Sequence, residues 1–329
     1  MNLTLRALST DDIPELARHL AAVEVADDTG EHYSEADLVE EFANPDIEVG
    51  KDIVGAFEGD QIVGYFAIYP RSTDGVLQKV HLEGSVRPDR RGEGLGTQLV
   101  EAMLARAEEV HAEKHPDLPA QLSLTGLSHN IAQRDLLASV GMVAQRWNFV
   151  MRIRLGLVPP SAEPPVKLAG ELELQRFEES FSAAMLEAHN QAFLDHPNFT
   201  PWTEVMWKQW VTGSRNYRPE LSFVVVDPSE PERVVAYLQT NEFDAYFEAT
   251  GRREAYVAKL GTVGDYRGRG LAGALLAHAL SAYQRAGFDE ASLDVDSENP
   301  TGALGIYERA GFAVESRWSS YALTRKPLH

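Results

Sequence analysis

The stretch VRPDRRGEGLGTQLVEAML spans Val86–Leu104, and TVGDYRGRGLAGALLAHAL spans Thr262–Leu280. Both contain an Arg followed by closely spaced small residues: Arg91-x-x-Gly94-x-Gly96 in one, and Arg267-x-x-Gly270-x-Ala272 in the other. Both then continue with apolar residues at helical spacing. We therefore predict the same unit twice: a strand, a Gly-rich loop and a helix.

This unit is suited to binding an anion. Small residues let a ligand approach the backbone closely. The first N–H groups of the following helix have no intrahelical partner, and they lie at its positive dipole end. Arg91 and Arg267 would add charge at the rim, so a diphosphate is the expected ligand.

The repeat extends to whole domains. Asp52–Pro70 matches Ser222–Thr240, each typical of two strands around a polar turn. A later strand is predicted over Ala120–Leu127 and over Glu290–Asp296. Each is followed by a short helix that ends at Gly. An offset of about 170 residues throughout indicates duplication of a complete domain. We predict domains at 1–155 and 171–329, joined by a Pro-rich linker at 156–170.

Composition limits the function classes. A length of 329 residues fits two domains, and 44% hydrophobic with 24% charged residues is ordinary for a soluble globular protein. We expect neither a membrane span nor a secretory signal, and hence a cytoplasmic location. The absence of cysteine excludes disulfides, thiolate metal sites and a cysteine nucleophile. We expect no metal, since His32 fits no ligand spacing. A net charge of −20 argues against nucleic acid as partner and is compatible with a cationic amine, although solubility alone would also explain it.

The loops, their place after a fourth strand, and the later segment LDVDSENPTGALGIYERAGF resemble the GNAT superfamily of N-acetyltransferases. The tandem arrangement is similar to that of mycothiol synthase. The resemblance implies two α/β domains, each a mixed sheet flanked by helices. It also implies acetyl-coenzyme A in a V-shaped split between the fourth and fifth strands, and direct acetyl transfer to an amine of a small molecule. The residues expected to bind the coenzyme are Val86, Arg91, Gly92, Gly94, Gly96, Thr97, Thr262, Val263, Arg267, Gly268, Gly270, Ala272, Gly273 and Asn299.

The resemblance also implies catalytic roles. A backbone N–H on the fourth strand, near Ser85–Val86 and Gly261–Thr262, would bind the thioester carbonyl. Tyr307, four residues before Gly311, is the expected acid for the departing thiolate, unless it only packs a helix onto the sheet. The same offset in the first copy gives Leu137, which cannot donate a proton. The C-terminal domain is therefore the expected catalyst.

The base is harder to assign from the sequence. Glu83 is a candidate in the first copy. In the second copy, Tyr256 stands where mycothiol synthase has a glutamate, so Glu254 is the expected base, with a solvated strand-end carboxylate as the alternative. The acceptor pocket is expected around His196, Phe199 and Trp202 in the second copy, and around the acidic residues Asp27, Asp28 and Glu31 in the first.

Gly268-x-Gly270-x-x-Gly273 satisfies a dinucleotide-binding fingerprint, with Asp294 at a tolerable distance. The loop does not follow a first strand, however, and Thr97 replaces the third glycine in the other copy, so we reject a Rossmann domain. Two rivals remain open. One is a sensor or scaffold that binds coenzyme A without turnover, and the other is an acetyltransferase acting on protein N-termini or lysines.

Overall fold

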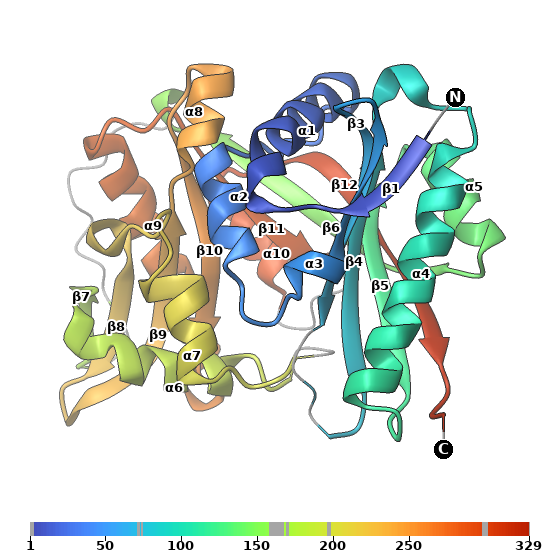
Figure 1. Cartoon of the computed structure of the whole chain (residues 1–329). Helices are drawn as coiled ribbons and strands as arrows, with labels where there is room; N and C mark the ends of the chain where they lie inside the picture. Colours follow the sequence, from blue (N-terminus) through green and yellow to red (C-terminus); the bar gives the residue numbers. More distant parts are fainter. Residues whose placement is uncertain are drawn as a thin grey trace. The chain divides into compact units, whose positions relative to one another are not determined.

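The computed structural model describes residues 3–70, 73, 75–157, 168, 171–195, 199–297 and 302–328 (Figure 1). The chain forms two compact units. The first unit comprises Met1–Trp147 and Arg317–His329, and the second unit comprises Asn148–Ser316. Asn299, His196 and most of the predicted linker lie outside the described residues.

The first unit is a mixed sheet with helices on both faces. Its strands follow the order β1-β2-β3-β4-β5-β12, and β4 and β5 are parallel. The elements are β1 (Leu3–Ala7), α1 (Ile13–Asp27), α2 (Glu35–Phe42), α3 (Val49–Asp52), β2 (Ile53–Glu58), β3 (Gln61–Pro70), β4 (Gln78–Val86), α4 (Leu95–Lys114), β5 (Ala120–Leu127), α5 (Ile131–Ser139) and the end of β12 (Ala313–Arg325).

Two apolar clusters hold this sheet to its helices. Strand side chains alternate between faces, so Val80 and Leu82 of β4 pack with Leu99 and Met103 of α4. The opposite face packs against α1 and α2. Glu83 of β4 lies on this second face, because it is next to Leu82 in the strand.

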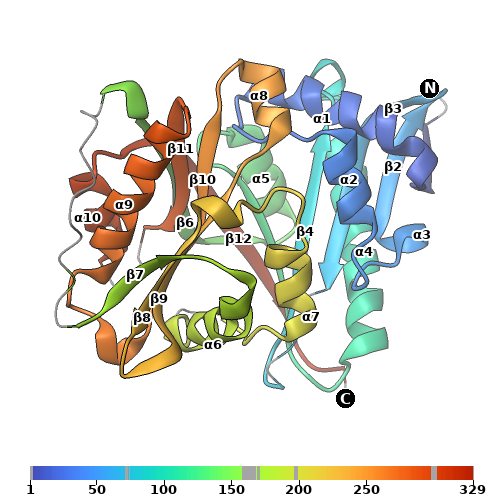
Figure 2. The same cartoon turned by 90° about the vertical axis from the view of Figure 1, so that its left-hand side faces the viewer.

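The second unit repeats this arrangement (Figure 2). Its strand order is β6-β11-β10-β9-β8-β7, with β10 and β11 parallel. The elements are β6 (Val143–Arg154), β7 (Glu173–Arg176), α6 (Ser182–Ala192), α7 (Glu204–Trp207), β8 (Phe223–Asp227), β9 (Glu230–Asn241), α8 (Asp244–Thr250), β10 (Glu254–Thr262), α9 (Leu271–Arg285), β11 (Glu290–Asp296) and α10 (Ala303–Arg309). Helix α9 packs on one face, and α6 and α7 pack on the other.

The predicted α/β class with mixed sheets is confirmed, and β5 and β11 have the predicted bounds. Both short helices, α5 and α10, are followed by a glycine in the left-handed region, Gly141 with φ 83° and Gly311 with φ 98°. Among the described residues, no helix combines the length and the apolarity needed to cross a bilayer.

The two units exchange their last strands. Asn148–Arg154 of β6, which ends the first half of the sequence, pairs with β11 in the second unit. Trp318–Arg325 of β12, which ends the second half, pairs with β5 in the first unit. The compact units therefore differ from the segments 1–155 and 171–329, because either strand carries the same alternating pattern and completes the same edge of a sheet.

Candidate functional site

The Gly-rich loops present open backbone at the start of a helix in both units. Gly94 has φ 83° and Gly270 has φ 77°, values that glycine adopts without strain. Helices α4 and α9 begin at the next residue, and neither glycine provides a side chain that could cap the helix. No described heavy atom lies within 4 Å of where a Cβ would stand at either glycine. Both helix starts can therefore accept a diphosphate on their N–H groups.

The loop arginines fasten the loops to their units. The guanidinium of Arg91 donates to both oxygens of Asp27 at 2.6 and 2.7 Å and to the carbonyl of Val86 at 3.2 Å. Arg267 donates to one oxygen of Asp195 at 2.7 Å, to the carbonyl of Ala192 at 2.7 Å and to the carbonyl of Thr262 at 3.2 Å. The positive charge of each loop arginine is thus largely compensated by an aspartate, Asp27 in the first unit and Asp195 in the second. Coenzyme binding by either arginine stays a prediction.

The parallel strands separate toward these loops. In the first unit, β4 and β5 pair from Gln78 to Leu82, and β4 then continues to Val86 paired with β3 only. In the second unit, β10 and β11 pair over Glu254–Tyr256, and β10 then continues to Thr262 paired with β9 only. Each unit therefore has a split between its two central strands that opens at the Gly-rich loop.

A cavity lies at the open end of the first unit's split. It has a volume of about 380 Å³. It joins the end of α1, the loop and the turn before α5, and its lining residues are Ala26, Asp27, Arg91, Leu127, His129, Asn130, Ile131 and Ala132. The predicted coenzyme ligand Arg91 thus faces free space in this unit.

The closed ends of the two splits differ in backbone geometry. In the second unit, the register between β9 and β10 shifts between Val257 and Lys259, so Ala258 is one residue extra. In the first unit, β3 and β4 pair without interruption from Gly64 to Pro70. A bulge leaves its extra residue outside the regular ladder. Among the described residues, therefore, only the split of the second unit has a peptide outside the regular strand pairing at its closed end.

Tyr307 lies on α10 and is 7% exposed. It packs beside Phe312, with ring centroids 6.2 Å apart, and its burial raises the pKa of its phenol to about 12. The corresponding Leu137 of α5 is also buried. Tyr307 therefore stays protonated at neutral pH, as a proton donor must, while its role remains a prediction.

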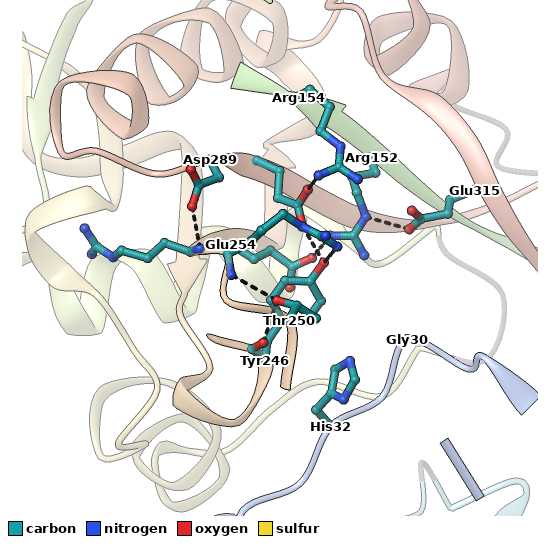
Figure 3. Close-up of polar contacts among 12 residues, drawn as sticks. Gly30, His32, Arg152, Arg154, Tyr246, Thr250, Glu254, Asp289 and Glu315 are labelled. Carbon is teal, nitrogen blue, oxygen red and sulfur yellow. Dashed lines mark hydrogen bonds and ion pairs between the residues drawn. The ribbon is translucent and has the colours of Figure 1, made fainter. Parts of the chain in front are cut away.

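The expected base Glu254 belongs to a buried ion-pair cluster (Figure 3). It is the first residue of β10, inside the paired stretch, and Arg152 of β6 binds its carboxylate. Arg152 also reaches Glu290 at 3.1 Å and Glu315 at 2.6 Å. Burial raises the pKa of Glu254, although the charge of Arg152 opposes this shift. Its surroundings favour a structural role, and its role as base stays a prediction.

Glu83 lies just beyond the last β4–β5 pair, at the closed end of the first split. The hydroxyl of Tyr65 donates to its carboxylate, and the hydroxyl of Tyr69 donates to Glu41 of α2. Burial raises the pKa of Glu83, and burial together with the charge of Glu83 raises the pKa of Glu41 to about 8. The sequence prediction found Glu83 but missed its neighbours. Tyr65 and Tyr69, an even number of strand positions apart, share a face and could have signalled them.

Aromatic residues fill the corresponding side of the second unit. Trp202 lies 4.4 Å from the ring of His189, measured between centroids, and Phe199 lies 5.4 Å from it. The hydroxyl of Tyr237 lies 2.5 Å from Nδ1 of His189. The predicted acceptor residues Phe199 and Trp202 are thus brought together, whereas Trp207 is a buried core residue and Trp210 is exposed. No group of three acidic or histidine side chains suited to a metal occurs within the part of the chain that is described.

The sequence matches the family described as Acetyltransferase (GNAT) family over residues 19–122 and 175–312. It is 28% identical over 321 residues to a mycothiol acetyltransferase of Corynebacterium aurimucosum, covering 93% of this chain and 96% of that protein. It is 29% identical over 253 residues to a mycothiol acetyltransferase of Gordonia bronchialis, covering 76% of this chain and 74% of that protein.

Solved structures of related acetyltransferases share this fold over nearly the whole chain. A GCN5-related N-acetyltransferase from Sphaerobacter thermophilus superposes with a TM-score of 0.77 and 26% identity, covering 99% of this chain and 96% of that one. A tandem GNAT protein from the clavulanic acid biosynthesis pathway has a TM-score of 0.69 and 16% identity, with 98% of both chains covered. The second likeness is one of fold alone.

Proposed function

The chain belongs to the acetyltransferase (GNAT) family and is a tandem N-acetyltransferase similar to mycothiol acetyltransferases, and from this premise we propose its substrates and its catalytic unit. It transfers an acetyl group from acetyl-coenzyme A to an amine of a small-molecule acceptor, and the second unit carries the reaction. The single observation that supports this unit most is its bulged strand beside the split.

The coenzyme is held by the split and the Gly-rich loop. Gly268, Gly270 and the first turn of α9 offer unpaired N–H groups to the diphosphate, with no atom in the way of a close approach. Thr262 ends β10, and Val263 follows it beside this loop. Acetyl-coenzyme A supplies the acyl group as an activated thioester.

The carbonyl is polarised by the bulge. An extended ligand anchored at the loop can reach into the split only until β10 and β11 pair again, at Tyr256 and Ser292. The peptide closest to that closed end and free of the regular ladder is Ala258. Its N–H would donate to the carbonyl oxygen as negative charge develops, which moves the expected contact from Gly261–Thr262 toward Ala258.

The proton for the departing sulfur comes from Tyr307. Its raised pKa of about 12 keeps the hydroxyl protonated, and donation to a thiolate becomes favourable only as that sulfur gains charge. In the first unit this position is Leu137, and the strand beside the split has no bulge. We therefore propose that the first unit binds a coenzyme without turning it over.

The acceptor is proposed from two observations. The relative from Corynebacterium aurimucosum, which matches 93% of this chain, is named for mycothiol, and the net charge of −20 favours a cationic amine over a polyanion.

Calorimetry with the loop variants Gly94→Glu and Gly270→Glu tests the assignment, because a carboxylate at either glycine repels a diphosphate. Wild type should bind two equivalents of acetyl-coenzyme A, and each variant should bind one. Acetylation of an amine panel containing glucosamine, cysteamine and spermidine should be lost in Gly270→Glu and retained in Gly94→Glu. Loss of turnover in Gly94→Glu alone would place catalysis in the first unit.

A further inference from the structure

Asp294 is an exposed carboxylate in the middle of a buried strand. Strand β11 lies between β6 and β10 in the second unit, and of its seven residues Asp294 alone is exposed. A charged residue at a central strand position has no packing reason to be there. Glu290, on the same face of β11, is explained by its bonds to Arg152, Arg154 and Arg252. Asp294 makes no such ion pair within the described part of the chain.

The strand register places Asp294 at the closed end of the split. Ser292 is paired with Tyr256, the last residue of the paired stretch. Asp294 follows Ser292 by two residues and faces the same side of the sheet. On the other strand, Ala258 follows Tyr256 by two residues. Asp294 and the bulge therefore stand on opposite sides of the opening, just beyond the point where the strands separate.

Tyr256 holds the carboxylate at this place. Its hydroxyl donates to Oδ2 of Asp294 at 2.7 Å, across the gap between β10 and β11. The ring of Tyr256 is in turn fixed against Phe243, with centroids 5.8 Å apart. One carboxylate oxygen is thereby oriented, and the other is left to accept a proton.

We propose that Asp294 is the general base of the second unit, with Tyr256 as its positioning residue. The inference rests on the proposed function of this unit. The acceptor ammonium transfers one proton to Asp294, and the neutral nitrogen forms the new C–N bond as the thioester C–S bond breaks. The nitrogen then loses its second proton to solvent, which leaves the neutral amide. The sulfur takes the proton of Tyr307. Solvent then removes the proton from Asp294 and returns one to Tyr307, so each turnover is balanced.

The electrostatic surroundings fit this role. Desolvation of the carboxylate raises the pKa of Asp294 above its ordinary value, whereas the hydrogen bond from Tyr256 and the charge of Lys259 oppose this shift. A higher pKa makes a carboxylate a stronger base, which an alkyl ammonium with a pKa of about 10 requires. A carboxylate also attracts the cation before the reaction.

The first unit lacks the pair. Allowing for the extra bulge residue, His81 matches Tyr256, and it pairs with Ser123 as Tyr256 pairs with Ser292. Two residues after Ser123 stands Thr125, which has no basic group at neutral pH. The base, the bulge and the tyrosine acid therefore occur together in one unit.

The test compares Asp294→Asn with wild type on two small amines, ethanolamine and hydroxylamine, with release of free thiol as the readout. Ethanolamine is protonated at neutral pH and needs a base, whereas hydroxylamine is largely neutral and does not. The kcat with ethanolamine should fall by about 100-fold or more, while that with hydroxylamine changes little. Asp244→Asn is the matched control, since Asp244 is an exposed carboxylate of α8 paired with Arg215. It should behave as wild type with both amines. An equal loss with both amines, or no loss with ethanolamine, overturns the inference.

A second readout needs no turnover. In the protein labelled with 13C at aspartate carboxyls, the signal lost in Asp294→Asn should titrate above the ordinary range of aspartate, and Tyr256→Phe should raise that pKa further because a stabilising hydrogen bond is lost. If the pKa of Asp294 is the same in Tyr256→Phe as in wild type, Tyr256 is not its positioning residue. If wild type acetylates nothing and binds no acetyl-coenzyme A, the proposed function fails instead, and the two failures are thereby distinguished.

Discussion

Replacing Arg152 with Met should destabilise the second unit by about 3–5 kcal/mol, the usual cost of leaving a buried carboxylate without its cation. Arg152 is 9% exposed at its side chain and is the cation that binds Glu254. Glu290 would keep Arg154 at 2.5 Å and Arg252 at 3.0 Å. The orphaned charge is therefore mainly that of Glu254.

Glu254→Gln should cost less, about 1–2 kcal/mol, because Arg152 keeps Glu290 and Glu315. The double variant should lose about 1 kcal/mol or more less stability than the sum of the two single losses. Once Glu254 is neutral, removing Arg152 no longer leaves its charge without a partner. Urea unfolding followed by tryptophan fluorescence suits this cycle, because Trp202, Trp207 and Trp210 all belong to the second unit. Arg152→Met should also be less harmful at pH 5 than at pH 8, because a buried Glu254 without its cation is more easily protonated at the lower pH. A loss below about 1 kcal/mol in Arg152→Met, or acetyl transfer abolished in a folded Glu254→Gln, would refute the structural role of this cluster.

Three further outcomes are expected. Tyr307→Phe should lower kcat by about 100-fold with little change in melting temperature, because the ring is kept and only the proton donor is lost; unchanged kcat in a steady-state assay would remove Tyr307 from the mechanism. The first unit should lose stability as the pH rises from about 4.5 toward 8, since the raised folded-state pKa of Glu41, about 8, favours its neutral form. Glu41→Gln should flatten that dependence in urea titrations, and an equally steep curve would contradict it. His189, whose burial lowers its pKa to about 3, should make the second unit less stable as the pH falls from 6.5 toward 4; His189→Phe should reduce this acid sensitivity, as fluorescence-monitored unfolding at pH 7.5 and 5 can show.

The parts of the fold and site that could be predicted from the sequence are those that depend on short local spacings of residues. The spacing from Arg267 to Ala272 locates a loop and a helix start, because few residues tolerate a positive φ there. The repeat doubles every such signal. Tyr307 was named as a candidate acid from its distance to Gly311 and the family resemblance, and that role stays a prediction.

The rest depends on contacts between residues far apart in the chain. Arg152 meets Glu254, Glu290 and Glu315 only after β6, β10, β11 and β12 are assembled, so no sequence spacing predicts the cluster. The bulge at Ala258 is one extra residue in an apolar strand, which leaves the alternation ambiguous rather than visibly broken. Asp294 was noticed for a nucleotide contact, and only the register with Tyr256 gives it a different meaning.

The exchanged strands have a consequence for how the protein is made. During synthesis the first unit leaves the ribosome without the strand that closes its sheet, because Trp318–Arg325 is translated near the very end. The edge of β5 therefore lacks its native partner strand while the second unit is produced, and an open strand edge invites pairing with other chains. Neither unit can complete its sheet ahead of the other, so both complete their folding together, late in synthesis. A chain truncated after the Pro-rich segment should therefore be prone to aggregate.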